Sequence, residues 1–488
     1  MQAAATVPDP DDDGPEIALF RKQKTIYPRW VKGVFRRRKW WLMALCLSIY
    51  YFAPFLRCDR GPHAPDQAIL IDMAGRRGYW FFIEIWPQEV YYLTAILIFA
   101  AVILFFATSL LGRVWCGYFC FQTVWTDLFR WVEYVVQGDS AERKRLDEGP
   151  WTLTKTRKKL VTHLGWLAIS LLTGGAFVLY FNDAPTLIHN LVNGHISSTV
   201  AMFVLGLTFS TYLMAGFARE QVCTFMCPYA RFQSSMFDKD SLVIAYDYRR
   251  GEPRGKHKRG DSWDGRGHCI DCTQCVQVCP MGIDIRNGLQ IECIACGLCI
   301  DACDSVMEKI GLPKGLVRYD TSRNLQRQLP PGTCVPAARL QFFRIRSFWY
   351  IGILSLVGIL VVYGLVTRTK LDLHVLHDRN PLFVRLSDGS IRNGYEIHLL
   401  NKTLQPQAYA LEISGVAGAV LSLGGIEGMT ADHLEVAPSS VGKFRVFVAA
   451  PAQDKPQVDI AFSAKDTDSE VTARHDSMFI SLEGGNRE

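Results

Sequence analysis

The sequence lacks the motifs that hold the common organic redox cofactors. No G-x-G-x-x-G follows a strand-like run, which argues against an NAD or FAD domain, and no phosphate-binding P-loop is present. No Cys-x-x-Cys-His occurs, so covalent c-type haem is not expected. The residues after Thr367 contain no cysteine, which excludes a stapling disulfide there. Any electrons that the chain handles must therefore come from a partner or a quinol and pass through other groups.

The chain also has little excess charge, since its net charge is +6 over 488 residues. Its basic residues gather beside apolar runs, which is typical of membrane orientation rather than of nucleic-acid binding, so we predict no nucleic-acid partner. Hydrophobic residues make up 49% of the chain and charged residues 20%. This mixture indicates membrane helices combined with water-exposed domains.

Five apolar segments are long enough, at about 17 to 25 residues, to cross a bilayer as helices. The first lacks a small-residue cleavage site, so we interpret it as an anchor rather than a signal peptide. The predicted spans are Trp40–Leu56, Gln88–Leu111, Leu160–Phe181, Ile196–Phe217 and Phe348–Val366.

The distribution of Lys and Arg predicts how these spans are oriented. Basic residues crowd into residues 21–39 and 113–159, whereas residues 182–195 contain none. Because basic loops stay on the cytoplasmic side, we expect an N-in, C-out protein of the bacterial inner membrane. The predicted domains are a basic cytoplasmic segment (1–39), four spans with their loops (40–218), a cytoplasmic region (219–347), the fifth span (348–366) and a periplasmic domain (367–488).

The C-terminal region has the pattern of an all-β domain. Short alternating runs are separated by turn residues such as Asp388-Gly389 and Asn393-Gly394, at the spacing of an immunoglobulin-like β-sandwich. We expect it to dock a partner or to support the rest of the chain, and we interpret its histidines as ordinary polar side chains. The predicted strands are Leu371–Leu376, Tyr395–Leu400, Lys443–Val448, Gln457–Phe462 and Met478–Leu482.

Fifteen cysteines are present, and eight of them form two tandem runs within residues 262–310. The runs are Cys269-x2-Cys272-x2-Cys275-x3-Cys279-Pro280 and Cys293-x2-Cys296-x2-Cys299-x3-Cys303. Such runs are typical of a bacterial two-cluster [4Fe-4S] ferredoxin, in which the fourth cysteine of each run ligates the other cluster. Zinc is the alternative, although zinc sites usually separate their cysteine pairs by longer loops. The predicted ligands are Cys269, Cys272, Cys275 and Cys303 for cluster I, and Cys293, Cys296, Cys299 and Cys279 for cluster II.

Two acidic residues accompany the second run. Asp304 stands where a proline follows the first run, and Asp301 lies three residues earlier. We hypothesise that this negative charge lowers the potential of a neighbouring cluster.

A second cysteine constellation follows two of the spans: Cys116-x3-Cys120 and Cys223-x3-Cys227-Pro228. On a helix, residues i and i+4 share one face, so the two pairs could together present four thiolates. Soft thiolates select Cu(I), zinc or iron-sulfur clusters. The alternative is that these cysteines are small buried apolar residues.

The remaining cysteines and some histidines have weaker patterns. We interpret Cys46 and Cys58 as packing residues and assign no role to Cys334. We expect polar roles for His163, His189 and His195, with metal ligation or quinone contact as the alternative.

Several of these motifs together resemble the CcoG/FixG/RdxA family, accessory proteins needed for maturation of cbb3-type cytochrome c oxidase. The resemblance covers nearly the whole chain, including the five spans and the C-terminal immunoglobulin-like region. Its carriers are the two ferredoxin runs, Gly112–Cys120 with Gln122–Trp125, Cys223–Tyr229, and Tyr246–Asp247 with Arg250–Gly255.

The resemblance implies reduction of Cu(II) to Cu(I) for delivery to the oxidase's haem-copper centre. It implies a copper site at Cys116, Cys120, Cys223 and Cys227, two [4Fe-4S] clusters, and oxidase subunits, copper chaperones or copper transporters as partners. The electron donor is left open between a ferredoxin, a flavoprotein and a quinol.

One departure from the family bears on the copper site. Family members usually have a proline after the first Cys-x3-Cys, where this chain has Phe121, so the backbone of that motif is expected to differ and the second pair is the safer assignment.

Two other functions are kept as alternatives. The paired motifs also resemble NapH-like quinol dehydrogenase subunits, which pass electrons outward. The third hypothesis is a non-enzymatic scaffold for oxidase assembly, in which the clusters only hold the fold together.

Overall fold

The computed structural model describes residues 25–481 except 63, 259–261, 327–335, 337, 339–340, 425–429, 454 and 468–470. The chain divides into two compact units, each built from three separate segments. Unit 1 contains Met1–Ser48, Ile103–Gly175 and Met202–Phe348, and unit 2 contains Ile49–Val102, Ala176–Ala201 and Trp349–Glu488.

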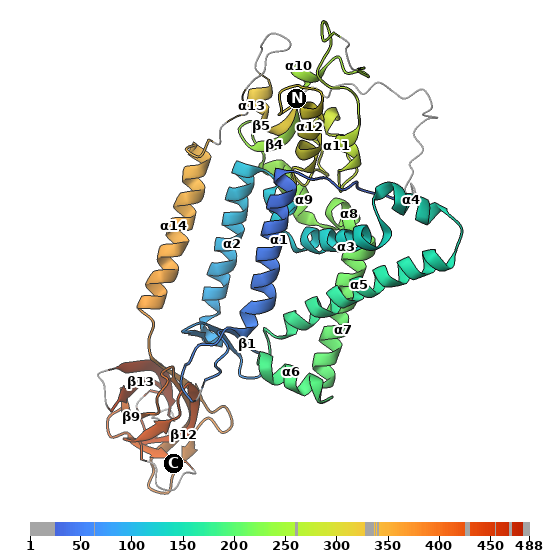
Figure 1. Cartoon of the computed structure of the whole chain (residues 1–488). Helices are drawn as coiled ribbons and strands as arrows, with labels where there is room; N and C mark the ends of the chain where they lie inside the picture. Colours follow the sequence, from blue (N-terminus) through green and yellow to red (C-terminus); the bar gives the residue numbers. More distant parts are fainter. Residues whose placement is uncertain are drawn as a thin grey trace, which may run out of the picture. The chain divides into compact units, whose positions relative to one another are not determined.

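Four helical segments in the described part of the chain are long and apolar enough to cross a membrane (Figure 1). They agree with the second to fifth spans expected from the sequence. The segments are Pro87–Leu111, which includes α2 (Val90–Leu111); α5 (Leu153–Val178); Ser198–Met226, which begins with α7 (Ser198–Leu213); and α14 (Ile345–Val366).

Helix α1 (Val34–Phe52), which contains most of the first predicted span, is not among these four. Its first turns carry the basic residues 36–39, and the helix ends at Phe52 before a short 3-10 turn, η1 (Ala53–Phe55). The uninterrupted apolar part of the helix is therefore shorter than the predicted Trp40–Leu56, and a fifth span is not found by length and composition.

Unit 1 contains the ferredoxin module. Strands β4 (Leu242–Tyr246) and β5 (Val317–Thr321) pair antiparallel and so bring together the two ends of the cysteine-rich region. Between them lie α10 (Tyr248–Gly251), α11 (Gln274–Gln277), η6 (Ile285–Asn287) and α12 (Leu298–Lys309). The buried core of the module includes Ile244, Ile285, Ile300, Met307 and Leu316.

Unit 1 also contains shorter helices besides its membrane segments and the ferredoxin module. The remaining elements are α3 (Phe121–Gln137), α4 (Ser140–Glu148), α8 (Arg219–Gln221), α9 (Pro228–Met236) and α13 (Ser322–Leu325). Phe129 of α3 is fully buried and stacks on Trp166 of α5, with ring centroids 5.3 Å apart. This contact fixes α3 against α5.

Unit 2 contains a small sheet and a β-sandwich. The sheet pairs β1 (Ile69–Asp72), β2 (Arg77–Trp80) and β3 (Ile83–Ile85) in sequence order. A short helix, α6 (Ala184–Val192), begins at Asp183, whose side chain accepts the N–H of Thr186. In the same unit the buried Glu89 accepts hydrogen bonds from Arg368 and Lys402 at 2.8 to 2.9 Å.

The C-terminal sandwich is confirmed. One sheet has the order β10-β12-β8-β6, with β7 added to β8, and the other has the order β11-β9-β13-β14. Alternate residues of both sheets bury a core that includes Tyr395, Tyr409, Phe462 and Phe479. The strands are β6 (Leu371–His377), β7 (Val384–Arg385), β8 (Ile391–Asn401), β9 (Gln407–Ser414), β10 (Val420–Leu423), β11 (Leu434–Val436), β12 (Ser440–Ala450), β13 (Gln457–Asp466) and β14 (Thr472–Ile480).

One of the two predicted turns in the sandwich is wrong. Asp388 and Gly389 do lie in a turn, but Asn393 and Gly394 lie inside strand β8. The Asn393 side chain is fully buried, donates to the Ile480 carbonyl at 2.9 Å and accepts the Ile480 N–H at 3.0 Å. Asn-Gly favours a turn locally, but here a hydrogen-bonded link to β14 overrides that preference.

Candidate iron-sulfur and thiol sites

The two ferredoxin runs share an unusual backbone conformation around their middle cysteines. In the first run Asp271 and Thr273 have φ of 53° and 54°, and in the second Ala295 and Gly297 have φ of 52° and 78°. Three of these four residues are not glycine, and such left-handed residues cost free energy and cluster at functional sites. The shared conformation turns each loop tightly about Cys272 and Cys296.

Four of the eight cysteines line one cavity. Cys269, Cys272, Cys275 and Cys303 enclose it together with Tyr246 and Arg286. These four are the set expected for cluster I, with three residues from the first run and the last residue of the second.

The other four cysteines are electrostatic neighbours of one another. Burial raises the pKa of the Cys299 thiol well above its usual range, and Cys296, Cys293, Cys279 and, from the first set, Cys275 raise it further. The structure therefore brings together the residues expected for cluster II.

The donor set fits iron-sulfur clusters chemically. Burial raises the pKa of Cys275 and Cys303 to about 12 and that of Cys279 to about 11. Thiolates in this core are therefore strongly disfavoured unless a metal compensates for their charge. Eight thiols in two sets, held by tight loops, match the ligands that two cubane clusters need.

Both Cys-x3-Cys motifs form the same local structure, which is a π-helical turn rather than the α-helical turn expected from the sequence. The turns are η3 (Trp115–Phe119) and η5 (Val222–Met226), and a third, η4 (Met214–Ala218), precedes α8. In each motif the second cysteine donates its N–H five residues back, from Cys120 to Trp115 at 2.9 Å and from Cys227 to Val222 at 2.8 Å. Such turns often occur at functional sites.

Phe121 does not alter the first motif, contrary to expectation. Cys120 and Cys227 both have extended backbone angles, with φ of −60° and −80° and ψ of 125° and 110°. Phe121 then starts α3 just as Pro228 starts α9. The proline suits this position but is not needed to produce it.

The structure brings these four thiols near one another. Cys116 has Cys120, Cys223 and Cys227 among its electrostatic neighbours, and burial raises its pKa to about 12. Its thiol donates a hydrogen bond to Oε1 of the fully buried Gln233 at 3.3 Å. Across the described residues, no three Cys, His, Asp or Glu side chains are arranged tightly enough to hold a single metal ion.

The first π-turn packs directly on the loop that carries the predicted cluster II ligands. Tyr118 donates its hydroxyl to the Cys296 carbonyl at 2.9 Å, and Arg113 donates to the Ile291 carbonyl. A Cβ on Gly117 would lie 2.7 Å from the Ile294 carbonyl oxygen. Cys116 itself packs against the small core that contains Cys296.

Arg250 matches a family motif in the sequence, but the sequence alone predicted no role for it. Its buried side chain donates to His268 Nδ1 at 2.8 Å and to the Lys314 carbonyl at 2.9 Å, and it also bonds the Pro313 carbonyl. His268 immediately precedes Cys269, so Arg250 positions the start of the first run. Tyr118 and Gln233 were also missed, because only the folded chain reveals their contacts with Cys296 and Cys116.

The two acidic residues of the second run have defined partners. Asp301 accepts the backbone N–H groups of Phe35 and Arg36 at 3.1 and 2.7 Å, which caps the start of α1. Asp304 accepts the Gly315 N–H at 2.8 Å and lies next to Cys303. Cys46 and Cys58 are free cysteines, and Cys334 lies outside the described residues.

Comparisons with known protein families support iron-sulfur domains in two parts of the chain. Residues 218–322 match the model of a 4Fe-4S dicluster domain, and residues 92–136, which contain Cys116 and Cys120, match that of a 4Fe-4S binding domain. Residues 361–481 match the model of the IG-like fold at the C-terminus of FixG.

Full-length relatives are similarly informative. The chain is 45% identical to nitrogen fixation protein FixG of Rhizobium meliloti, over 91% of this chain and 90% of FixG. It is 47% identical to protein RdxA of Cereibacter sphaeroides, over 90% of this chain and 92% of RdxA. It is 45% identical to protein RdxB of the same organism, over 95% of this chain and 97% of RdxB. A solved FixG-related protein from Vibrio parahaemolyticus covers 23% of this chain and 96% of its own, with 24% identity and a TM-score of 0.20. The chain therefore belongs to the FixG/RdxA family, and it is an iron-sulfur redox protein with apolar membrane helices.

Proposed function

We propose that this protein reduces Cu(II) to Cu(I) at the thiols of Cys116, Cys120, Cys223 and Cys227. The observation that carries the proposal is that Cys116, which has the other three thiols among its electrostatic neighbours, packs against the small core that contains Cys296. A site for copper and a source of electrons are then adjacent within unit 1.

The ligands of the clusters follow the two sets described above. Cys269, Cys272, Cys275 and Cys303 hold one [4Fe-4S] cluster, and Cys293, Cys296, Cys299 and Cys279 hold the other. When bound, the clusters supply electrons one at a time.

The chain's own residues favour the reduced copper ion. Soft thiolates bind Cu(I) more tightly than Cu(II), which raises the potential of the copper couple and makes the one-electron reduction downhill. Cu(I) can be held by as few as two thiolates, so two of these four thiols suffice. The Gln233 amide holds Cys116 in place before copper arrives.

The proposed location is the bacterial inner membrane, with the ferredoxin module in the cytoplasm and the sandwich in the periplasm. Support for this orientation comes from the basic residues 21–39 and 113–159. The proposed recipients of Cu(I) are subunits of a cbb3-type oxidase, or copper chaperones or transporters that serve it. A ferredoxin, a flavoprotein or a quinol supplies the electrons.

The test is anaerobic reoxidation of the dithionite-reduced protein by Cu(II), in which cluster bleaching and trapped Cu(I) are recorded together. We expect one Cu(I) for each electron lost, at a rate above that with a quinone as oxidant. Replacing all four cysteines by serine should abolish the fast phase, whereas Cys46→Ser, which changes a cysteine outside both motifs, should not.

Iron analysis of the same preparations separates the alternatives. About eight iron atoms per chain fit two clusters and a copper site, whereas about twelve would mean that the four membrane thiols hold a resident cluster. Oxidation by quinone alone would instead favour the NapH-like function. Redox-silent, air-stable clusters would favour an assembly scaffold.

A further inference from the structure

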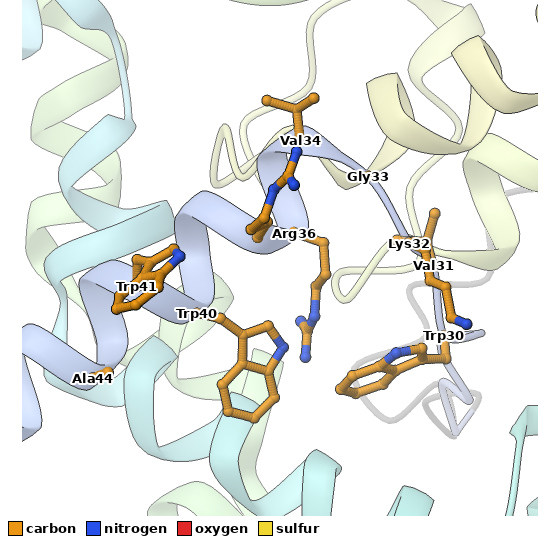
Figure 2. A pocket seen from close by; sticks show the side chains of 10 residues that line it. Trp30, Val31, Lys32, Gly33, Val34, Arg36, Trp40, Trp41 and Ala44 are labelled. Atoms are coloured by element: carbon orange, nitrogen blue, oxygen red, sulfur yellow. The ribbon is translucent and has the colours of Figure 1, made fainter.

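An open groove of about 810 Å³ lies at the start of α1, and the proposed function does not use it. Figure 2 shows Arg36 between the rings of Trp30 and Trp40, with Trp41 next along the helix. The Arg36 guanidinium carbon lies 4.0 Å from the Trp30 ring centroid and 5.2 Å from that of Trp40. Lys32, Arg37 and Ala44 complete the polar and apolar parts of the lining.

The groove is supported from behind by a rigid network. Arg36 donates to both carboxylate oxygens of Asp127, at 2.9 and 3.0 Å, and its side chain is only 7% exposed. Trp30 stacks on Tyr134 at 4.6 Å, and Trp40 meets Trp131 edge to face at 6.1 Å. The aromatic walls are therefore already in place before a ligand binds.

Hydrogen-bonding chemistry narrows the class of ligand. The polar lining side chains are lysine, arginine and tryptophan, which carry donors and no acceptors, and no acidic side chain among the described residues lines the groove. A quinol needs acceptors for its hydroxyl protons and finds none among these side chains. A phosphodiester is anionic and offers only acceptors, so it complements this lining.

The same face of α1 continues as an apolar surface. Trp41 and Leu45 lie one turn apart on the helix and are 74% and 54% exposed. A free phosphate makes no contact with this apolar surface. A lipid would place its acyl chains along the surface and its headgroup beside Lys32 and Arg37. Tryptophan and basic residues are enriched at this level of membrane proteins.

We propose that this groove binds an anionic phospholipid, with the phosphodiester held by Lys32 and Arg37 and the glycerol region packed against the tryptophans. The segment that forms the groove also holds the ferredoxin module. Val31 packs against the core that contains Cys296, and Phe35 lies against Gly297 and Tyr319. The lipid therefore stabilises a segment that packs on the predicted cluster II loop.

The experiment is native mass spectrometry of the full-length holoprotein in detergent, titrated separately with phosphatidylglycerol and phosphatidylcholine. We expect phosphatidylglycerol to bind at least about tenfold more tightly. The double variant Lys32→Gln/Arg37→Gln should lose about 10- to 30-fold in affinity for phosphatidylglycerol, because each basic residue contributes separately to anionic lipid binding.

The matched control removes two exposed basic residues of α4 in the same unit, as Lys144→Gln/Arg145→Gln, and should change the affinity by less than about twofold. Equal affinities for the two lipids, or equal losses in the two double variants, would overturn the proposal, because binding would then reflect diffuse charge. Lys32 and Arg37 are exposed, so their replacement should preserve the fold, and unchanged cluster absorbance verifies this.

Discussion

The hydroxyl of Tyr118 donates a hydrogen bond to the carbonyl oxygen of Cys296 at 2.9 Å, across 178 positions of sequence. Tyr118 lies in the π-turn between Cys116 and Cys120, and Cys296 lies in the second ferredoxin run. A single bond thus ties the proposed copper site to a predicted ligand of cluster II.

Tyr118→Phe should remove this bond while leaving the ring in place. We expect a loss of about 1 kcal/mol in stability and an altered EPR spectrum of one cluster only, because the carbonyl of a ligand residue loses its donor. Tyr180→Phe is the matched control, since Tyr180 makes a hydroxyl-to-carbonyl bond of the same 2.9 Å length to Tyr50 in unit 2. If both variants left both EPR signals unchanged, the bond would have no influence on the cluster.

Gly117→Ala should disturb the second ferredoxin loop. The added Cβ would lie 2.7 Å from the Ile294 carbonyl oxygen and 3.1 Å from Cα of Cys296, so backbone must shift. We expect iron to fall from about eight to about four atoms per chain as one cluster is lost. Gly175→Ala is the control, because a Cβ there meets nothing within 4 Å. Full iron content in Gly117→Ala would show that the loop can move without cost.

Asp304→Asn tests the hypothesis that negative charge lowers a cluster potential. The amide still accepts the Gly315 N–H, so the change removes charge and little else. We expect the midpoint of the cluster ligated by Cys303 to rise by tens of millivolts, on the order of 1 to 2 kcal/mol. Burial raises the pKa of Asp304, so the titration should be run at alkaline pH to favour the ionised carboxyl. Asp264→Asn, at an exposed site, should leave both midpoints unchanged, and unmoved midpoints in Asp304→Asn would refute the hypothesis.

Removal of iron by ferricyanide and a chelator should destabilise only part of the protein. The ferredoxin core includes cysteine side chains, whereas the sandwich core contains none. We expect one calorimetric transition to fall by about 10 °C or more and a second, assigned to the sandwich, to stay within about 2 °C. A common shift of both transitions would mean that the two cores unfold together.

Much of this architecture could be predicted from the sequence because its signals are local. The spacing of the eight cysteines predicted which of them lie together, and apolar length predicted four helices. The first span stays a prediction, because the basic start of α1 and its end at Phe52 shorten its apolar run. Asn393 was misjudged because its partner, Ile480, lies 87 residues away.

The conformation of the Cys-x3-Cys motifs could not be predicted for a different reason. A spacing of four residues is compatible with both α- and π-helical turns, and only the backbone hydrogen bonds distinguish them. The role of Phe121 depends in the same way on backbone angles that many residues adopt. The roles of Tyr118, Gln233 and Arg250 arise from contacts between distant segments, which leave no local pattern.

The contacts of residues 29–36 determine whether the iron-sulfur region can be separated from the rest of the chain. Arg29 donates its N–H to the Gln277 carbonyl at 2.8 Å, Phe35 covers Gly297, and Asp301 caps α1. Residues 262–310 therefore do not form an independent domain, because they depend on contacts with residues 29–36. A fragment of residues 262–310 alone would expose the apolar surface that Val31 and Phe35 cover in the whole chain. Such a fragment would aggregate more readily than an independent ferredoxin domain.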